Sequence, residues 1–254
     1  MKKLFIITGA SRGLGASFVK LLMEKDSHFI LIARNIEKLN LFRDNYSTQN
    51  IMIEPHSIDL SKPEFYDDLN KIFNKLAWSK YSKVVLINNA STILPIKHLN
   101  KVNINEINNL IHLNLSSCIA TSQLFMDYCK GNSIKNSYII NISSGVSLAP
   151  VEGWGLYCIS KAAINMLSSV IANDSMNWEY PIKSVSINPG PLDTSMQKMI
   201  RESDVSQNPA KDKFVNMFND GELFNPEQVA NKIINILLKE DFSSGSFINL
   251  NDYT

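Results

Sequence analysis

Short apolar runs alternate with longer amphipathic segments along the whole length of the chain. The runs are rich in valine and isoleucine, and most are followed by a segment with helical periodicity. Strands of a parallel sheet that is buried on both faces need such runs, and the helices between them act as crossover connections. We therefore expect an α/β fold with an open, doubly wound, mostly parallel sheet and helices on both faces. The seven expected strands are residues 4–8, 28–33, 50–55, 83–90, 137–144, 182–190 and 247–250.

The composition suits one domain with a substantial core. The chain has 254 residues, of which 44% are hydrophobic, and residues 1–254 are expected to form a single domain. The formal net charge is +1, from 25 basic and 24 acidic residues, and no basic run suggests a nucleic-acid surface. The expected partner is instead a small molecule.

Other features predict a cytoplasmic protein without a metal site. The cysteines are odd in number and lack metal-ligand spacing, which is typical of reduced thiols: Cys118, Cys129 and Cys158. The apolar N-terminal stretch is too short for a signal peptide, and no window is expected to reach membrane-spanning length. Residues 193–221 are polar and weakly periodic, which predicts a mobile lid.

The first expected strand ends in the glycine-rich stretch TGASRGLG, residues 8–15. Gly9, Gly13 and Gly15 permit a tight turn and a close approach of the backbone to a ligand. The N-terminus of the following helix would offer free N–H groups to a pyrophosphate. An ordinary strand-to-helix turn is the alternative interpretation, and the position after the first strand makes it the weaker one.

The second expected strand ends in Ala33-Arg34, where an acidic residue would select NAD. An arginine at this point can neutralise the 2′-phosphate of NADP, and Arg12 in the glycine loop could supply a second guanidinium. Each arginine could instead be an exposed residue at a helix start. Taken together, they favour NADP(H) over NAD(H).

Four motifs in order resemble the signature of the classical short-chain dehydrogenase/reductase family. They are TGASRGLG (8–15), LINNAS (86–91), NISS (141–144) with YCISK (157–161), and NPGPLDT (188–194). Within that family, GWGLYC (153–158), PGPLDTSMQ (189–197) and FSSGSFI (242–248) resemble the sepiapterin reductases and the bacterial benzil reductases similar to them. The resemblance implies a single-domain Rossmann fold, and a homodimer, possibly a tetramer, built on the long helices after the fourth and fifth strands.

The resemblance also implies a catalytic set. Tyr157 would protonate the carbonyl oxygen, and Lys161, one helical turn away, would lower the pKa of the phenol and hold the nicotinamide ribose. Ser144, thirteen residues before Tyr157 as in the family, resembles the serine that hydrogen-bonds the substrate carbonyl. Strand alternation lets only one of Ser143 and Ser144 face the site, and the family separation selects Ser144. Asn114 matches the asparagine that frees a backbone carbonyl for a proton-relaying water.

The family motifs imply a wider set of cofactor contacts. Asp59 would lie beside the adenine or else cap the helix that follows, and Thr194 would bond the carboxamide or else cap the lid helix. The implied contacts are Gly9, Ser11, Arg12, Gly13, Leu14, Gly15, Arg34, Asp59, Leu60, Asn88, Asn89, Ala90, Tyr157, Lys161, Pro189, Gly190, Leu192 and Thr194.

The substrate end departs from the sepiapterin reductases. Alignment on Gly245 puts Asn249 where those enzymes carry the aspartate that anchors the pterin, and Asp252 is too far along the chain to replace it. The expected substrate contacts are Ser144, Val146, Trp154, Tyr157, Met196 and Asn249, with Leu148 and Pro150 as further apolar candidates that could equally be packing residues. We therefore expect an NADPH-dependent reductase of vicinal dicarbonyls. The alternatives are a sepiapterin reductase and an NADP(H)-binding redox sensor.

Overall fold

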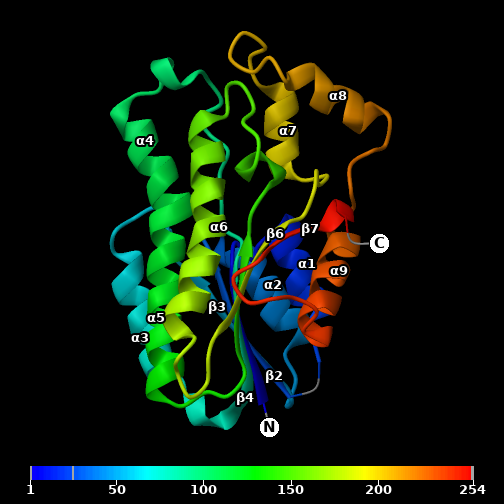
Figure 1. Cartoon of the computed structure of the whole chain (residues 1–254). Coiled ribbons are helices and arrows are strands. Elements are labelled where there is room, and N and C mark those ends of the chain that lie inside the picture. Colours follow the sequence, from blue (N-terminus) through cyan, green and yellow to red (C-terminus); the bar gives the residue numbers. More distant parts are fainter. Residues whose placement is uncertain (1, 25, 253–254) are drawn as a thin grey trace.

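The computed structural model describes residues 2–24 and 26–252, and it forms three layers (Figure 1). All seven strands are parallel, in the order β3-β2-β1-β4-β5-β6-β7. They are β1 (Lys2–Thr8), β2 (Ser27–Ala33), β3 (Ile51–Ser57), β4 (Tyr81–Asn88), β5 (Ser137–Ile142), β6 (Lys183–Asn188) and β7 (Phe247–Asn249). This is the predicted doubly wound Rossmann fold.

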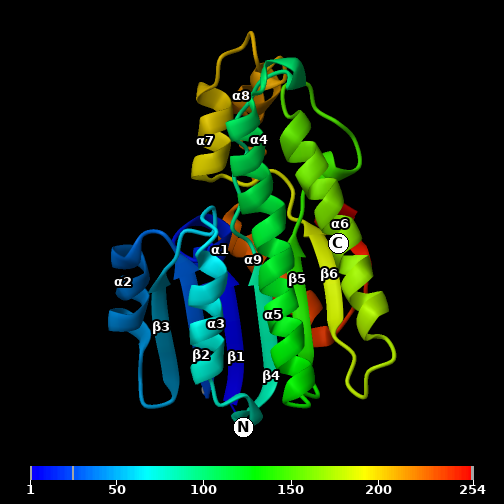
Figure 2. The ribbon, with the colours of Figure 1, turned by 90° about the vertical axis from the view of Figure 1, so that its left-hand side faces the viewer.

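Helices cover both faces of the sheet, as Figure 2 shows. One face carries α1 (Gly13–Leu21), α2 (Ile36–Tyr46) and α9 (Pro226–Lys239). The other face carries α3 (Phe65–Lys75), α5 (Ser117–Gly131) and α6 (Gly155–Ser175). Strand alternation divides the core accordingly, because Phe5 and Ile7 of β1 pack with α1 and α9, whereas Leu4 and Ile6 pack with α3 and α5.

A long helical rod follows β4 and the loop after it. It consists of α4 (Ile104–Ile111), a π-helical turn (His112–Ser116) and α5. π turns inside α-helices are rare and often lie at functional sites.

Helix α6 passes a length and composition test for a membrane span, with a hydropathy of 1.3 over its most apolar window. The expectation that no window reaches this length was wrong. The fold explains these apolar residues in another way, because 44% of the window is buried and Ile164 and Ile171 are buried hydrophobic residues.

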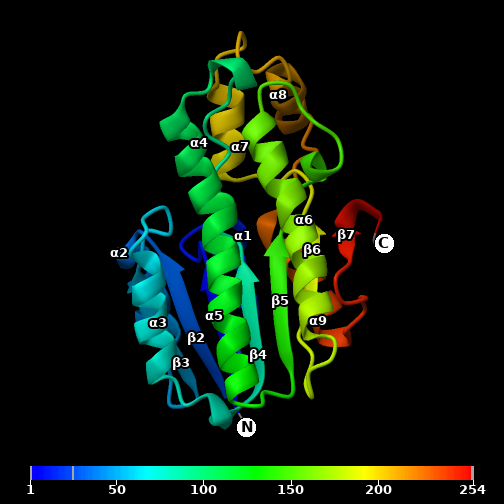
Figure 3. The same cartoon turned by 60° about the vertical axis from the view of Figure 1, so that its left-hand side comes forward.

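The segment predicted as a lid contains α7 (Ser195–Glu202) and α8 (Lys211–Asn219). Both helices lie beyond the carboxyl ends of the strands, beside the N-terminal half of α6 (Figure 3). The polar composition of these helices gave little periodic signal, because they bury few residues: α7 buries Gln197 and Ile200, and α8 buries none.

Candidate active site

The sequence motifs meet in one cavity of about 1490 Å³ at the carboxyl edge of the sheet. Its walls come from the segments after all seven strands, together with α6, α7, α8 and α9. This is the edge at which open parallel sheets bind their ligands.

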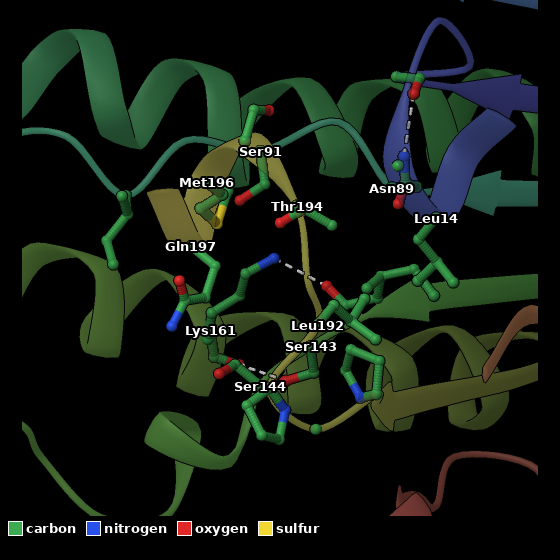
Figure 4. Close-up of a pocket in the computed structure, with 18 of the residues that line it drawn as sticks. Leu14, Asn89, Ser91, Ser143, Ser144, Lys161, Leu192, Thr194, Met196 and Gln197 are labelled. Carbon is green, nitrogen blue, oxygen red and sulfur yellow. Dashed lines mark hydrogen bonds between the residues drawn. The ribbon is translucent and has the colours of Figure 1, made fainter. Parts of the chain in front are cut away.

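Helix α6 brings Tyr157 and Lys161 to the same wall. Lys161 is 4% exposed, and its Nζ donates a hydrogen bond of 2.7 Å to the carbonyl oxygen of Ile142 at the end of β5. The Nζ lies 5.6 Å from the centroid of the Tyr157 ring. Figure 4 shows Lys161 reaching into the cavity between Thr194 and the Ser143–Ser144 segment.

The two serines after β5 face different partners. Both line the cavity, but the Ser143 hydroxyl donates to Oδ1 of Asn165 at 2.6 Å and more weakly to the Lys161 carbonyl at 3.3 Å. The Ser144 hydroxyl lies within hydrogen-bonding reach of the Tyr157 phenol, and it accepts a long bond of 3.5 Å from the Val146 N–H. The hydroxyl beside Tyr157 is therefore that of Ser144.

Burial controls the protonation of both groups on α6. It raises the pKa of the Tyr157 phenol to about 12, against a smaller lowering by the Ser144 hydrogen bond. It also lowers the pKa of Lys161 to about 8. Lys161 is not among the causes of the pKa shift of Tyr157, and the lowering of the phenol pKa by Lys161 together with an oxidised nicotinamide stays a prediction. Tyr157 therefore keeps its proton at neutral pH.

Asn114 lies in the π turn and clamps the backbone of Thr92. Its Oδ1 accepts the Thr92 N–H at 2.8 Å, and its Nδ2 donates to the Thr92 carbonyl at 2.7 Å and to the Ser160 hydroxyl at 3.2 Å. The side chain is 2% exposed and lies behind the large cavity. Asn114 can therefore influence the site only by holding the backbone of Thr92 in place.

The glycine loop and the segment after β4 interlock. A Cβ on Gly15 would lie 2.2 Å from the Gly9 carbonyl oxygen, so the helix start packs directly on the turn. Asn89 donates to the carbonyl oxygens of Thr8 and Gly9 at 3.0 and 3.2 Å. Most of the expected cofactor contacts line the cavity: Gly9, Ser11, Arg12, Gly13, Leu14, Arg34, Asp59, Leu60, Asn89, Ala90, Pro189, Gly190, Leu192 and Thr194.

Two of the expected cofactor contacts do not line this cavity. Gly15 is packed on the turn, and Asn88 points into the protein interior, where its Nδ2 donates to Ser122 and Asn141 at 3.0 and 2.9 Å. Their positions indicate that they hold the loops rather than touch a ligand.

Three exposed cations stand at the end of the cavity formed by β1 and β2. They are the expected Arg12 and Arg34 and one that the sequence analysis missed, Lys38. Lys38 lies in the first turn of α2, four residues after Arg34, and this closeness in sequence could have revealed it.

Asp59 lies at the same end of the cavity but caps no helix, because α3 begins later, at Phe65. Its Oδ1 accepts from the backbone and hydroxyl of Ser61 at 3.0 and 2.7 Å. Partial burial works to raise the pKa of this carboxyl, but these bonds and the Arg34 charge outweigh it and lower the pKa.

Apolar side chains surround the opposite end of the cavity. Val146, Pro150, Trp154 and Met196 line it as expected, whereas Leu148 is 70% exposed and does not. Thr194 occupies the N-cap position of α7 without a side-chain capping bond. It lies beside the glycine loop instead, since a Cβ on Gly13 would be 3.3 Å from its methyl group.

The structure does not bring Asn249 into the cavity, which corrects the alignment on Gly245. In the β6–β7 pairing Asn249 is opposite Asn188, whose Nδ2 donates to its Oδ1 at 2.9 Å. Its own Nδ2 donates to Asp252 at 3.0 Å, so both ends of the amide have partners. Leu250 and Asn251 line the cavity instead.

A model of the short chain dehydrogenase family matches residues 3–205. The chain belongs to this family. It is therefore an oxidoreductase, of a family that uses nicotinamide cofactors.

Characterised relatives cover nearly the whole chain. The benzil reductase ((S)-benzoin forming) of Bacillus cereus is 34% identical over 97% of this chain and 98% of its own length. The sepiapterin reductase of Rattus norvegicus is 31% identical over 97% of this chain and 95% of its own. The crystal structure of the KRED1-Pglu enzyme superposes with a TM-score of 0.81 at 26% identity, covering 97% of this chain and all of that one.

Proposed function

We propose that this enzyme is an NADPH-dependent carbonyl reductase that converts a vicinal dicarbonyl to a hydroxyketone. The observation that carries the proposal is the meeting of Ser144, Tyr157 and Lys161 in one cavity that has three cations at one end and an apolar wall at the other. The cofactor, when bound, supplies the hydride. The cations Arg12, Arg34 and Lys38 would hold its 2′-phosphate and so select NADPH.

The protein side of the reaction follows from the protonation states. The Ser144 hydroxyl and the Tyr157 phenol would bond the carbonyl oxygen, polarising it before hydride reaches the carbon. As hydride adds to the carbonyl carbon, the carbonyl oxygen becomes negative, and it takes the proton of the Tyr157 phenol. A phenol whose pKa is raised to about 12 keeps this proton at neutral pH, and an alkoxide is basic enough to remove it. Nearby Lys161 would then stabilise the phenolate.

The apolar end favours aryl or alkyl dicarbonyls. The side chains that form it offer little to a polar heterocycle: Ile93, Val146, Val151, Trp154, Met196 and Phe214. Benzil reductases of Bacillus cereus and Bacillus subtilis, at 34% and 30% identity, support this substrate class.

A sepiapterin reductase is the second candidate, because rat sepiapterin reductase is 31% identical. The amide of Asn251 lines the cavity and would have to anchor the pterin in place of a carboxylate. A redox-sensing protein that binds NADP(H) without turnover is a candidate of another class, and the complete Ser-Tyr-Lys set speaks against it.

We also propose a cytoplasmic location, with its support in the three buried free cysteines. Helices α7 and α8 would form the lid over the substrate, within one NADP-binding domain that spans the chain.

Cofactor oxidation with benzil, 1-phenyl-1,2-propanedione, diacetyl and sepiapterin, measured with NADPH and with NADH, tests the proposal. We expect turnover of the diketones with NADPH and little turnover of sepiapterin. Preferred turnover of sepiapterin would favour the second candidate. Tight NADPH binding without any turnover would favour the sensor.

Replacing Tyr157 by Phe tests the proposed acid. We expect a loss of at least about 100-fold in kcat, since general acid catalysis contributes that much, with NADPH affinity nearly unchanged. The matched control is Ser143→Ala, whose hydroxyl points at Asn165 rather than the phenol. Loss of NADPH binding in Tyr157→Phe would mean that the residue is structural.

A further inference from the structure

Trp154 links the catalytic tyrosine to the lid helices. It occupies the N-cap position of α6, is 3% exposed, and lies three residues before Tyr157. The edge of its ring meets the Tyr157 ring at a centroid distance of 6.3 Å and an angle of 69°. On α8, Phe214 stacks on the indole at 4.9 Å. The indole is thus held between the catalytic helix and the lid.

The same indole has one polar partner, Asn208. This residue lies in the turn between α7 and α8, and it is fully buried. Its Oδ1 accepts the Trp154 Nε1–H at 3.0 Å, and its Nδ2 donates to the Ser203 hydroxyl at 2.9 Å and more weakly to the Ile200 carbonyl at 3.4 Å. The amide therefore connects the end of α7 to the start of α6 with every polar atom in use.

The backbones of the two segments also touch. Gly153 has a φ of +80°, and a Cβ at this position would lie 2.1 Å from the Gln207 carbonyl oxygen. Only glycine permits both this conformation and this approach. Residues 153–154 and 207–208 consequently form one compact junction directly before the catalytic helix.

We propose that Asn208 is a positioning residue that fastens the α7–α8 segment to Trp154 and thereby closes the apolar end of the cavity around the substrate. This inference rests on the proposed carbonyl reductase function. Asn208 does not line the cavity, but Trp154, Met196 and Phe214 do. Release of the junction would move this wall and leave the cation end of the cavity in place.

The decisive variant is Asn208→Ala, compared with Lys211→Met. Lys211 donates to the Ser203 carbonyl at 2.7 Å, so its loss removes a hydrogen bond inside the α7–α8 segment but leaves the Asn208–Trp154 bond that fastens the segment to α6. For Asn208→Ala we expect the diketone KM to rise about tenfold, as loss of a buried hydrogen bond allows, and the NADPH Kd to change less than about twofold. Lys211→Met should leave both constants near the wild-type values.

A second variant guards against misfolding of the first. Trp154→Phe keeps an aromatic ring for Phe214 and Tyr157 but removes the N–H that Asn208 accepts. If the rise in KM comes from loss of the Asn208–Trp154 hydrogen bond, the double variant Trp154→Phe/Asn208→Ala should raise the diketone KM no more than Trp154→Phe alone. Additive effects would overturn the inference.

Limited proteolysis gives a readout independent of turnover. Cleavage within residues 195–220 should be faster in Asn208→Ala than in the wild type and Lys211→Met. Unchanged KM and unchanged cleavage, or an equal weakening of NADPH binding, would overturn the inference. If the wild type reduces no carbonyl compound, the proposed function fails, and proteolysis still decides whether Asn208 fastens the segment.

Discussion

Lys161 is a buried cation, 4% exposed, whose Nζ donates a hydrogen bond to the Ile142 carbonyl. Its pKa is lowered from 10.5 to about 8, so the folded chain releases this proton more readily than the unfolded chain. Between those two pH values the unfolded state binds more protons, and stability rises with pH. Below about pH 8 Lys161 is charged in both states, and burying its charge lowers the free energy of unfolding by the full amount, on the order of 3 kcal/mol.

The buried Lys161 ammonium predicts how the stability of Lys161→Met depends on pH. Its stability relative to the wild type should fall by roughly 3 kcal/mol between about pH 7 and pH 10.5, because only the wild type gains stability over that range. Urea unfolding at several pH values measures how the stability difference between the variant and the wild type changes with pH. Loss of the Ile142 hydrogen bond shifts this difference equally at every pH and therefore does not affect its change. Exposed Lys20→Met is the control, and parallel curves for Lys161→Met and the wild type would refute the argument.

At the residue scale, sequence identified side chains whose spacing is fixed by a single element. Tyr157 and Lys161 share a helix face, and the separation of thirteen residues from Tyr157 selected Ser144. The expectation that only one serine faces the site was wrong, because both lie after the end of β5 and both line the cavity. Asn249 was placed wrongly because motif spacing carries no information about its pairing with Asn188 across β6 and β7. Asn208 was missed because its partner Trp154 is 54 residues away.

At the scale of elements, the β2–α2 junction is the best candidate for cofactor selection. The strand ends at Ala33, and Asn35 caps α2 by accepting the Lys38 N–H at 2.9 Å. This cap fixes the start of the helix and puts Arg34 and Lys38 on the cavity wall. The strand and its terminal arginine were predictable from the apolar run, whereas α7 and α8 were not, because little of their surface is buried.

Replacing Arg34 by Ala should weaken NADPH binding about 10- to 100-fold and NADH binding less than about twofold, because only NADPH carries the 2′-phosphate. Fluorescence titration with both cofactors measures this. Arg43→Ala on the same helix is the control, since Arg43 pairs with Asp44 and does not line the cavity. Equal losses for the two cofactors would refute the assignment of Arg34.

At the scale of the molecule, the parallel sheet explains why motifs spread over nearly 190 residues act together. Every strand ends at the same edge, so the motif that follows each strand reaches the same cavity. Fold class and site location were therefore predictable from the order of runs and motifs. The outer surface was not, since exposure depends on which face each helix turns away from the sheet.

That surface carries an apolar strip along α5 and α6. Ile159, Met166 and Val170 of α6 are 51, 64 and 43% exposed, and Ile119 of α5 is 45% exposed. The α6 residues lie seven and four positions apart and so share one helix face. The homodimer implied by the family resemblance would pair through this strip about a two-fold axis and bury the apolar face that α6 turns away from the sheet.

Met166→Glu should convert the dimer to a monomer in size-exclusion chromatography with light scattering. A two-fold interface contains each substitution twice, so two carboxylates would lose water and lie near each other. Leu41→Glu is the control, because Leu41 is 59% exposed on α2, on the other face of the sheet. A wild-type monomer would refute the pairing. A tetramer that Met166→Glu reduces to dimers would support pairing through this strip and would require a second interface elsewhere. A dimer that persists in Met166→Glu would place the interface on another surface.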